Sequence, residues 1–205
     1  QPLMSAPSRQ LTIGGLILAG GQNRRMGGLH KAALRDSAGV RFLDRIAGAM
    51  GSSAERLLST NTPALAEGTA FTPVPDRFPD TGPLGGIASA LLFCRSDGLL
   101  TVSCDVPLVT PELFDFLRSF QDRGWPAWAV EDRTGRLHPL CGVYTKECLP
   151  LLLSQLEQGQ RRVTRFFQSV GGQVVSLAGT SIPDTALANV NTPEEWDRLR
   201  TAGNL

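Results

Sequence analysis

The feature that most constrains this chain is an apolar segment that runs directly into a glycine-rich, basic loop. Residues 16–19 read Leu-Ile-Leu-Ala, and residues 20–31 read Gly-Gly-Gln-Asn-Arg-Arg-Met-Gly-Gly-Leu-His-Lys. The apolar residues predict a buried strand, and the glycines let backbone N–H groups approach an anion closely. The basic side chains can neutralise phosphate oxygens. We therefore expect residues 20–31, the phosphate loop, to bind a polyphosphate, with Arg25 and Lys31 as electrostatic clamps.

The spacing within the phosphate loop excludes two common phosphate-binding motifs. A Walker A loop places Ser or Thr directly after Gly-Lys, whereas Lys31 follows His30 and precedes Ala32. A dinucleotide-binding fingerprint needs G-x-G-x-x-G, whereas here five residues separate two glycine pairs. The loop belongs to another class of nucleotide-binding motif.

The overall charge indicates that anion binding is local. The chain has 20 basic and 19 acidic residues, so we expect neither nucleic acid nor a membrane surface as a partner. No stretch reaches the roughly 18 apolar residues of a membrane span, and residues 1–10 lack the pattern of a leader. We expect a cytoplasmic protein with reduced, buried cysteines and no zinc site.

Alternating strand and helix patterns predict a three-layer α/β domain with a mostly parallel sheet. We expect a flexible segment at residues 1–10 and one domain over residues 11–205. Expected strands cover 11–18, 55–60, 71–76, 98–103, 127–130, 137–144 and 173–177. Expected helices cover 42–50, 87–93, 110–120, 146–156, a short stretch around 166–167 and the segment after Thr192. Gly85 and Gly86 would precede the helix at 87–93 and offer free N–H groups to an anion.

Two aspartates follow expected strands, at the sheet edge where open α/β sheets bind ligands. Asp105 comes after the apolar run 98–103, and Pro107 prevents further strand pairing. Mg²⁺ suits this place, because one or two carboxylates plus substrate phosphates hold it; the alternative is a capping or turn aspartate. Asp76 ends a short strand beside Pro75, where it either faces a nucleotide or is a solvated turn residue.

The order L-A-G-G-x-x-x-R-M-G-x-x-x-K resembles the first loop of nucleotidyltransferases that activate sugars and cofactors. Later segments resemble the molybdenum cofactor guanylyltransferase family in its own order: Asp76, Gly82-Pro83-Leu84-Gly85-Gly86-Ile87, Cys104-Asp105-Val106-Pro107, His138-Pro139, Gly159-Gln160-Arg161-Arg162-Val163 and Asn189-Val190-Asn191-Thr192-Pro193-Glu194-Glu195. The resemblance covers residues 11–200.

The resemblance implies a Rossmann-like domain that transfers GMP from GTP to the phosphate of molybdopterin or Mo-molybdopterin, with Mg²⁺ as cofactor and release of pyrophosphate. The N-terminal half would bind the nucleotide and the C-terminal half the acceptor. By position, the nucleotide contacts would be Leu18, Ala19, Gly20, Gly21, Lys31, Asp76 and Asp105, the metal ligand Asp105, and the acceptor contacts Arg161, Arg162, Asn189 and Asn191. We also expect molybdenum-insertion and molybdoenzyme chaperone proteins as partners.

The chain departs from the family pattern at two places. The family often has Asp where His30 stands, and commonly Asn where Ser59 stands, with Asn61 two residues further on. We expect Ser59 and Asn61 to contact the nucleotide. We assign His30 no role as a base, because a phosphate monoester with a second pKa of about 6 is already ionised near neutral pH.

Three other functions remain open at this stage. A cytidylyltransferase for the same acceptor would share the first loop. A sugar-1-phosphate nucleotidyltransferase would leave Arg161-Arg162-Val163 and residues 189–195 unexplained. A non-catalytic nucleotide- or pterin-binding carrier would bind GTP without releasing pyrophosphate.

Overall fold

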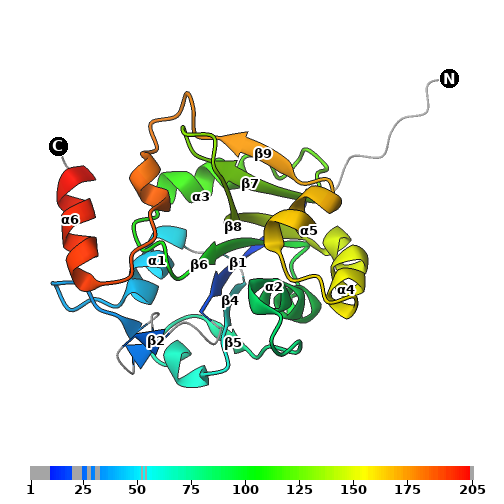
Figure 1. The fold of residues 1–205 in the computed structure, drawn as a ribbon, viewed down its shortest axis with the longest axis horizontal. Coiled ribbons are helices and arrows are strands. Elements are labelled where there is room, and N and C mark those ends of the chain that lie inside the picture. The colour runs from blue at the N-terminus through cyan, green and yellow to red at the C-terminus, as the bar shows by residue number, and fades with distance from the viewer. Residues whose placement is uncertain are drawn as a thin grey trace.

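A computed structural model describes residues 10–19, 25–26, 29–30, 33–51, 53 and 55–203, and for residues 25–26, 29–30 and 202–203 it describes the backbone alone. Within these residues, seven strands form a central sheet in the order β5-β4-β1-β6-β8-β7-β9, with helices on both sides (Figure 1). The strands are β1 (Ile13–Leu18), β4 (Arg56–Ser59), β5 (Thr72–Val74), β6 (Gly98–Ser103), β7 (Ala127–Glu131), β8 (Leu137–Thr145) and β9 (Gln173–Ser176). The predicted three-layer α/β class is confirmed.

The sheet is mostly parallel, as predicted. Strands β5, β4, β1 and β6 run in the same direction, and β9 is parallel to β7. Only β8, among the described strands of this sheet, runs against its neighbours β6 and β7. The C-terminal ends of β5, β4, β1 and β6 therefore meet at one side of the sheet, the carboxyl edge, where sheets of this kind bind ligands.

The two faces of the sheet are covered by different helices. One face packs against α1 (Phe42–Met50) and α3 (Pro111–Arg118), and the other packs against α2 (Gly82–Phe93), α4 (Leu149–Glu157) and α5 (Val163–Ser169). Strand β1 serves both cores, because alternate side chains point to opposite faces: Ile17 joins the first cluster, and Leu16 and Leu18 join the second. All residues of β6 are buried, as the apolar run predicted for a central strand.

The last helix, α6 (Pro193–Gly203), is attached by a separate apolar group. This end cluster consists of Leu34, Phe42, Val190 and Trp196. The rings of Phe42 and Trp196 lie 5.6 Å apart, and the Arg45 guanidinium lies 5.4 Å from the Trp196 ring. The end cluster thereby joins the segment after the phosphate loop, α1 and the C-terminal segment, and Figure 1 shows α6 beside α1 at the margin of the domain.

The predicted caps and turns around these elements are confirmed in most cases. Thr110 Oγ1 accepts a hydrogen bond from Leu113 N at the start of α3, and Thr192 Oγ1 accepts one from Glu195 N at the start of α6. The hairpin of β7 and β8 turns at residues 132–135, where Gly135 has a φ of +85°. Short 3-10 helices complete the fold at Pro63–Ala66, Lys146–Cys148 and Asp184–Leu187.

The predicted start of α2 is wrong. The helix begins at Gly82 instead of Ile87, so Gly85 and Gly86 lie inside it, where backbone N–H groups bond to the preceding turn. Their expected role as free anion donors is therefore also wrong. A Cβ at Gly86 would lie only 2.7 Å from Ser59 Oγ and 3.1 Å from Leu18 Cδ2, so this glycine permits close packing of α2 on the sheet.

Smaller differences concern strand and helix ends. Strand β1 begins at Ile13, because the backbone N and Oγ1 of Thr12 bond to the Asp97 carboxylate at 2.9 and 3.0 Å before the sheet pairing starts. Helix α3 ends at Arg118, before the predicted Phe120. The prediction for residues 1–10 falls almost entirely outside the described residues.

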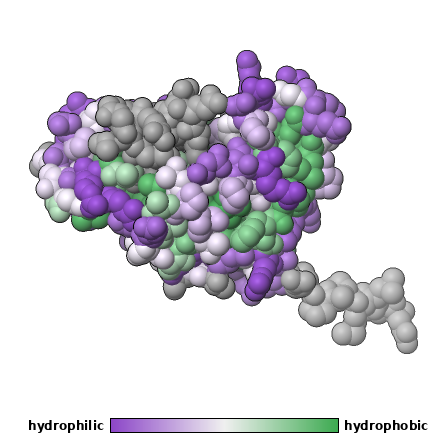
Figure 2. Space-filling view, turned by 90° about the horizontal axis from the view of Figure 1, so that it is seen from below, coloured by the Kyte–Doolittle hydropathy of each residue, from purple (hydrophilic) through white to green (hydrophobic). Residues whose placement is uncertain are grey.

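The described surface is of mixed character. The exposed large apolar side chains are Leu92 and Phe93 on α2 and Val174 on β9, and Figure 2 shows apolar areas set among hydrophilic ones. None of the helices in the described part of the chain has the length and apolar character to cross a membrane. All four cysteines are buried thiols that form no disulfide, as expected for core residues.

Candidate active site

The carboxyl edge holds the chain just before the phosphate loop between two neighbouring strand ends. Ala19 N donates to Ser59 O at 2.9 Å, and Cys104 N donates to Leu18 O at 3.1 Å. These bonds continue the sheet beyond β1 on both sides, so the chain enters the phosphate loop from the middle of the edge. Leu18 and Ala19 are both buried, and their contact with a nucleotide stays a prediction.

Asp105 lies two residues after β6, directly beside this entry point. Its backbone N donates to Ser103 Oγ at 3.3 Å, and its side chain is half-buried. Its carbonyl oxygen accepts a hydrogen bond of 2.7 Å from Val190 N. The structure therefore brings the predicted metal ligand against the segment that carries the predicted acceptor residues, far away in the sequence.

The segment 189–191 is held from two further sides. The Val190 side chain is buried in the end cluster, whereas Asn189 is exposed and Asn191 half-buried. Asn191 N donates to Glu195 Oε2 at 3.0 Å, which ties the segment to the first turn of α6. The backbone of both predicted acceptor asparagines is thus fixed next to Asp105.

Asp76 lies in the turn between β5 and α2 and is also half-buried. Its backbone N donates to Asn61 Oδ1 at 3.0 Å, and its Oδ1 accepts a hydrogen bond of 2.8 Å from Phe78 N. The Asn61 side chain therefore lies against the Asp76 turn, and its predicted contact with a nucleotide is untested. The Ser59 side chain is buried beneath α2, opposite Gly86.

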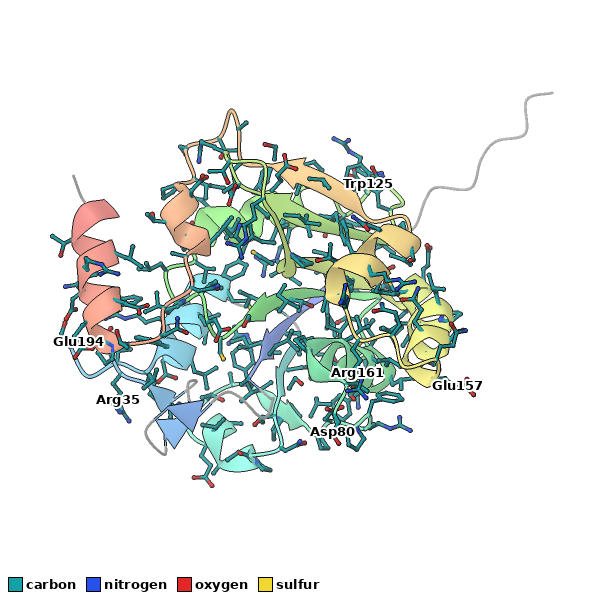
Figure 3. The ribbon with its side chains drawn as sticks, in the orientation of Figure 1. Arg35, Asp80, Trp125, Glu157, Arg161 and Glu194 are labelled. Carbon is teal, nitrogen blue, oxygen red and sulfur yellow. The ribbon has the colours of Figure 1, made fainter. Side chains whose placement is uncertain are left out.

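Arg161 and Arg162 lie in the exposed turn between α4 and α5. Gln160 holds this turn, because its Oε1 accepts from Arg162 N at 2.6 Å and its Nε2 donates to Gln155 Oε1 at 2.9 Å. Figure 3 shows Arg161 in the turn between α4 and α5. Among the described hydrogen bonds and ion pairs, none joins either arginine to Asp105 or to residues 189–191, so the shared acceptor role of these residues stays a prediction.

Several predicted residues fall on positions that the structure describes incompletely or not at all. Gly20, Gly21 and Lys31 lie outside the described residues. Arg25 and His30 are described by backbone alone and pair with each other in a short antiparallel ladder, β2 (Arg25–Met26) with β3 (Leu29–His30). The roles of these residues stay predictions.

The donor atoms near Asp105 suit a cation that takes ligands from its substrate. Within the described part of the chain, no group of three or more His, Cys, Asp and Glu residues could hold a metal ion. Structural zinc usually has four protein ligands, whereas Mg²⁺ typically takes one or two carboxylates with phosphate and water. A site with Asp105 as its single carboxylate would be of the kind that Mg²⁺ occupies, and Mg²⁺ itself stays a prediction.

Sequence reasoning missed two contacts that shape this edge. Ser89, fully buried in α2, hydrogen-bonds to the turn that carries Asp76; a serine within the apolar run Ile-Ala-Ser-Ala-Leu was the available indication. His138 Nε2 and Asp132 Oδ2 lie 2.9 Å apart at the β7–β8 turn, and hydrogen bonds from His138 and Thr134 hold the pKa of Asp132 well below its usual range.

Comparisons with known proteins agree with this geometry. Residues 15–174 match a family model described as the MobA-like NTP transferase domain. A protein of Cereibacter sphaeroides named molybdenum cofactor guanylyltransferase is 36% identical over 194 residues, which cover 91% of this chain and 95% of that protein. The chain belongs to the molybdenum cofactor guanylyltransferase family.

Another member of the guanylyltransferase family and two solved structures are also similar to this chain. A Pelotomaculum thermopropionicum protein named "Probable molybdenum cofactor guanylyltransferase" is 32% identical, with 91% of each chain covered. The structure of molybdopterin-guanine dinucleotide biosynthesis protein A from Archaeoglobus fulgidus superposes with a TM-score of 0.74 at 19% identity and covers 94% of this chain and 100% of that one. A CMP:2-keto-3-deoxy-manno-octonic acid synthetase complexed with CTP superposes with a TM-score of 0.67 at 13% identity, covers 95% of this chain and 100% of that one, and shares the fold.

Proposed function

We propose that this family member transfers GMP from GTP to the terminal phosphate of molybdopterin, with release of pyrophosphate and with Mg²⁺ as cofactor. The hydrogen bond from Val190 N to Asp105 O carries this proposal, because it joins the two halves of the site at one point. Nucleotide residues from the first half of the chain and acceptor residues from the last part then face the same carboxyl edge. Such an arrangement suits a reaction between two bound substrates.

The chief obstacle to this reaction is repulsion between two anions. An acceptor phosphate oxygen must approach the α-phosphorus of GTP in line with the departing pyrophosphate. Arg25 and Lys31 would neutralise phosphate oxygens from the phosphate loop, and Arg161 with Arg162 would hold the acceptor phosphate. Asp105 would hold Mg²⁺, which when bound neutralises further phosphate charge.

No protein base is required for this transfer. A phosphate monoester has a second pKa of about 6 and already carries the attacking charge near neutral pH. The work of the protein is therefore to place both substrates, with Asn189 and Asn191 on the acceptor side and Asp76 on the nucleotide side. This division also explains why His30 can stand where relatives often have Asp.

The choice of base is tested by comparing nucleotides. Purified protein would be given molybdopterin, Mg²⁺ and either GTP or CTP, and pyrophosphate release would be followed. We expect turnover with GTP at least about tenfold faster than with CTP, because the wrong base leaves hydrogen-bonding groups of the site unpaired. Faster turnover with CTP would contradict the guanylyl assignment, and GTP binding without pyrophosphate release would indicate a carrier.

We further propose a cytoplasmic location and contact with molybdenum-insertion and molybdoenzyme chaperone proteins. All four cysteines are buried thiols that form no disulfide, which is compatible with a reducing compartment. Burial raises the pKa of Cys141 to about 12, so this thiol stays protonated and unreactive. Because the dinucleotide product must reach apo-enzymes, co-purification of a tagged, full chain with such chaperones would test the partners.

A further inference from the structure

Ser89 is a buried polar residue that the proposed mechanism does not use. It lies in the middle of α2 with no exposed surface, and its neighbours along the helix are apolar or small. A buried hydroxyl destabilises a fold unless it is hydrogen-bonded. The hydrogen-bond partners of Ser89 therefore indicate its role.

The partners of Ser89 lie in the turn that carries Asp76. Ser89 Oγ accepts a hydrogen bond of 2.9 Å from Arg77 N and lies 3.4 Å from Asp76 Oδ1, to which it can donate. The single Ser89 hydroxyl proton is donated chiefly to Gly85 O at 2.8 Å within the helix, so Asp76 Oδ1 is the second and longer acceptor of a shared hydrogen bond. The bond to Gly85 is one that serines make in many helices, whereas the two contacts with Arg77 and Asp76 join α2 to the turn after β5.

Other contacts leave the Asp76 carboxylate few alternative positions. Phe78 N donates to the same Oδ1 at 2.8 Å, and Asn61 Oδ1 holds the Asp76 backbone N at 3.0 Å. A Cβ at Gly85 would lie 3.2 Å from Oδ1, so the helix backbone itself approaches this oxygen closely. Since Phe78 N and Ser89 Oγ both contact Oδ1, we expect the second oxygen, Oδ2, to be the one that meets a ligand.

We propose that Ser89 is a positioning residue that orients the Asp76 carboxylate towards the nucleotide. The proposal rests on the proposed function for the identity of the nucleotide. Ser89 does not touch the reacting phosphates, so it affects the binding of GTP and leaves the transfer step and the acceptor unchanged.

The test compares Ser89→Ala with a matched buried hydroxyl at the opposite edge of the sheet. Thr145 is buried, its Oγ1 donates to Pro126 O at 2.7 Å, and it pairs with Gly98 at the start of β6. We expect Ser89→Ala to weaken GTP binding by about fivefold, the effect of one lost hydrogen bond, with kcat and the acceptor KM within about twofold. Thr145→Val should lower the Tm to a similar extent and leave GTP binding unchanged.

A double-mutant cycle separates orientation of Asp76 from a general structural effect. If Ser89 acts through the carboxylate, Ser89→Ala should weaken GTP binding further by less than about 1.5-fold in an Asp76→Asn background. The same fivefold loss in both backgrounds, or no loss in the wild-type background, would overturn the proposal. If Ser89→Ala does not fold, Ser89→Cys keeps the side-chain size with a weak donor and acceptor and gives the same comparison.

Calorimetric titration measures GTP binding without the transfer reaction, so it tests the role of Ser89 independently of the proposed function. A wild-type protein that binds GTP without transferring GMP would contradict the transferase, while the Ser89 and Asp76 variants would still report on orientation. Unchanged GTP affinity in Ser89→Ala, together with normal transfer by the wild type, would contradict the inference alone.

Discussion

Asp105 and Asp76 lie at the same edge of the sheet but are supported in different ways. Asp105 directly follows the central strand β6, and its backbone is bonded to Ser103 and to Val190. Asp76 follows the edge strand β5, and side chains from two other elements, Asn61 and Ser89, hold its turn. The sheet and the C-terminal segment place the first acid, whereas a few side chains place the second.

This difference teaches what each acid can do. An acid whose backbone is fixed by the sheet and by the predicted acceptor segment would suit a metal ligand, because these bonds hold its position. An acid oriented by side chains suits selection among nucleotides, because single substitutions can tune its direction. The two acids should therefore fail in different ways when they are replaced.

The largest effect is expected for Asp105→Ala. Loss of the carboxylate should lower kcat by about 10³-fold, because electrostatic stabilisation of the transferring phosphate is lost, and the Tm should change little because the side chain is half-buried. Steady-state pyrophosphate release and thermal unfolding would measure both. Asp115→Ala on α3 is the control, since that side chain is 80% exposed; equal activity of the two variants would break the comparison.

Asp76→Asn should have a smaller and more selective effect. We expect the KM for GTP to rise by about tenfold, as for one charge-assisted hydrogen bond, with the acceptor KM unchanged. Initial rates at varied GTP and at varied acceptor would distinguish the two constants. A fall in kcat as large as that of Asp105→Ala would assign the same role to both acids.

Arg161→Ala sharpens the acceptor side of the comparison. This exposed arginine should raise the acceptor KM by about fivefold, because one solvent-accessible contact to a phosphate is lost, and leave the KM for GTP unchanged. Arg165→Ala is a matched control, because Arg165 is equally exposed on the adjoining helix α5. The same acceptor KM in both variants would remove Arg161 from the site.

The smallest effect is expected for a third acid, Asp132, which directly follows β7. Its pKa is lowered in the folded protein, chiefly by the hydrogen bond from His138, so this stabilisation is complete above the ordinary pKa of Asp and is lost as the pH falls through the lowered value. Asp132→Asn should lower the Tm by about 1–2 °C at pH 7, and the difference should shrink in strong acid. A Tm difference that grows on acidification would contradict this origin.

The strands, most helices and Asp105 could be predicted because their information is local. An apolar run, an acid and then Pro107 indicate a strand end without reference to the rest of the chain. The start of α2 could not, because Gly-Pro-Leu-Gly-Gly has the composition of a loop, and Gly86 is required by the approach of Ser59 and Leu18 from two strands.

Contacts between distant segments could not be predicted either, because they depend on residues far away in the sequence. Nothing near Val190 indicates that its N–H bonds to Asp105, and nothing near Ser89 indicates that it faces Arg77. Family resemblance named Asn189 and Asn191 as acceptor residues, but only the fold shows that Val190, between them, is bonded to Asp105 and buried in the end cluster. Local patterns named the candidate site residues, and tertiary packing determines how the described ones are held.

The central claim is that a nucleoside triphosphate and its cation are bound at the carboxyl edge with Asp105 as the metal ligand. The most direct test is electron paramagnetic resonance of Mn²⁺, used in place of Mg²⁺, titrated into the protein with GTP. We expect the wild type to bind Mn²⁺ tightly when GTP is present and Asp105→Ala to bind it at least about tenfold more weakly. Equal Mn²⁺ affinity in the two proteins, at the same occupancy by GTP, would contradict the account.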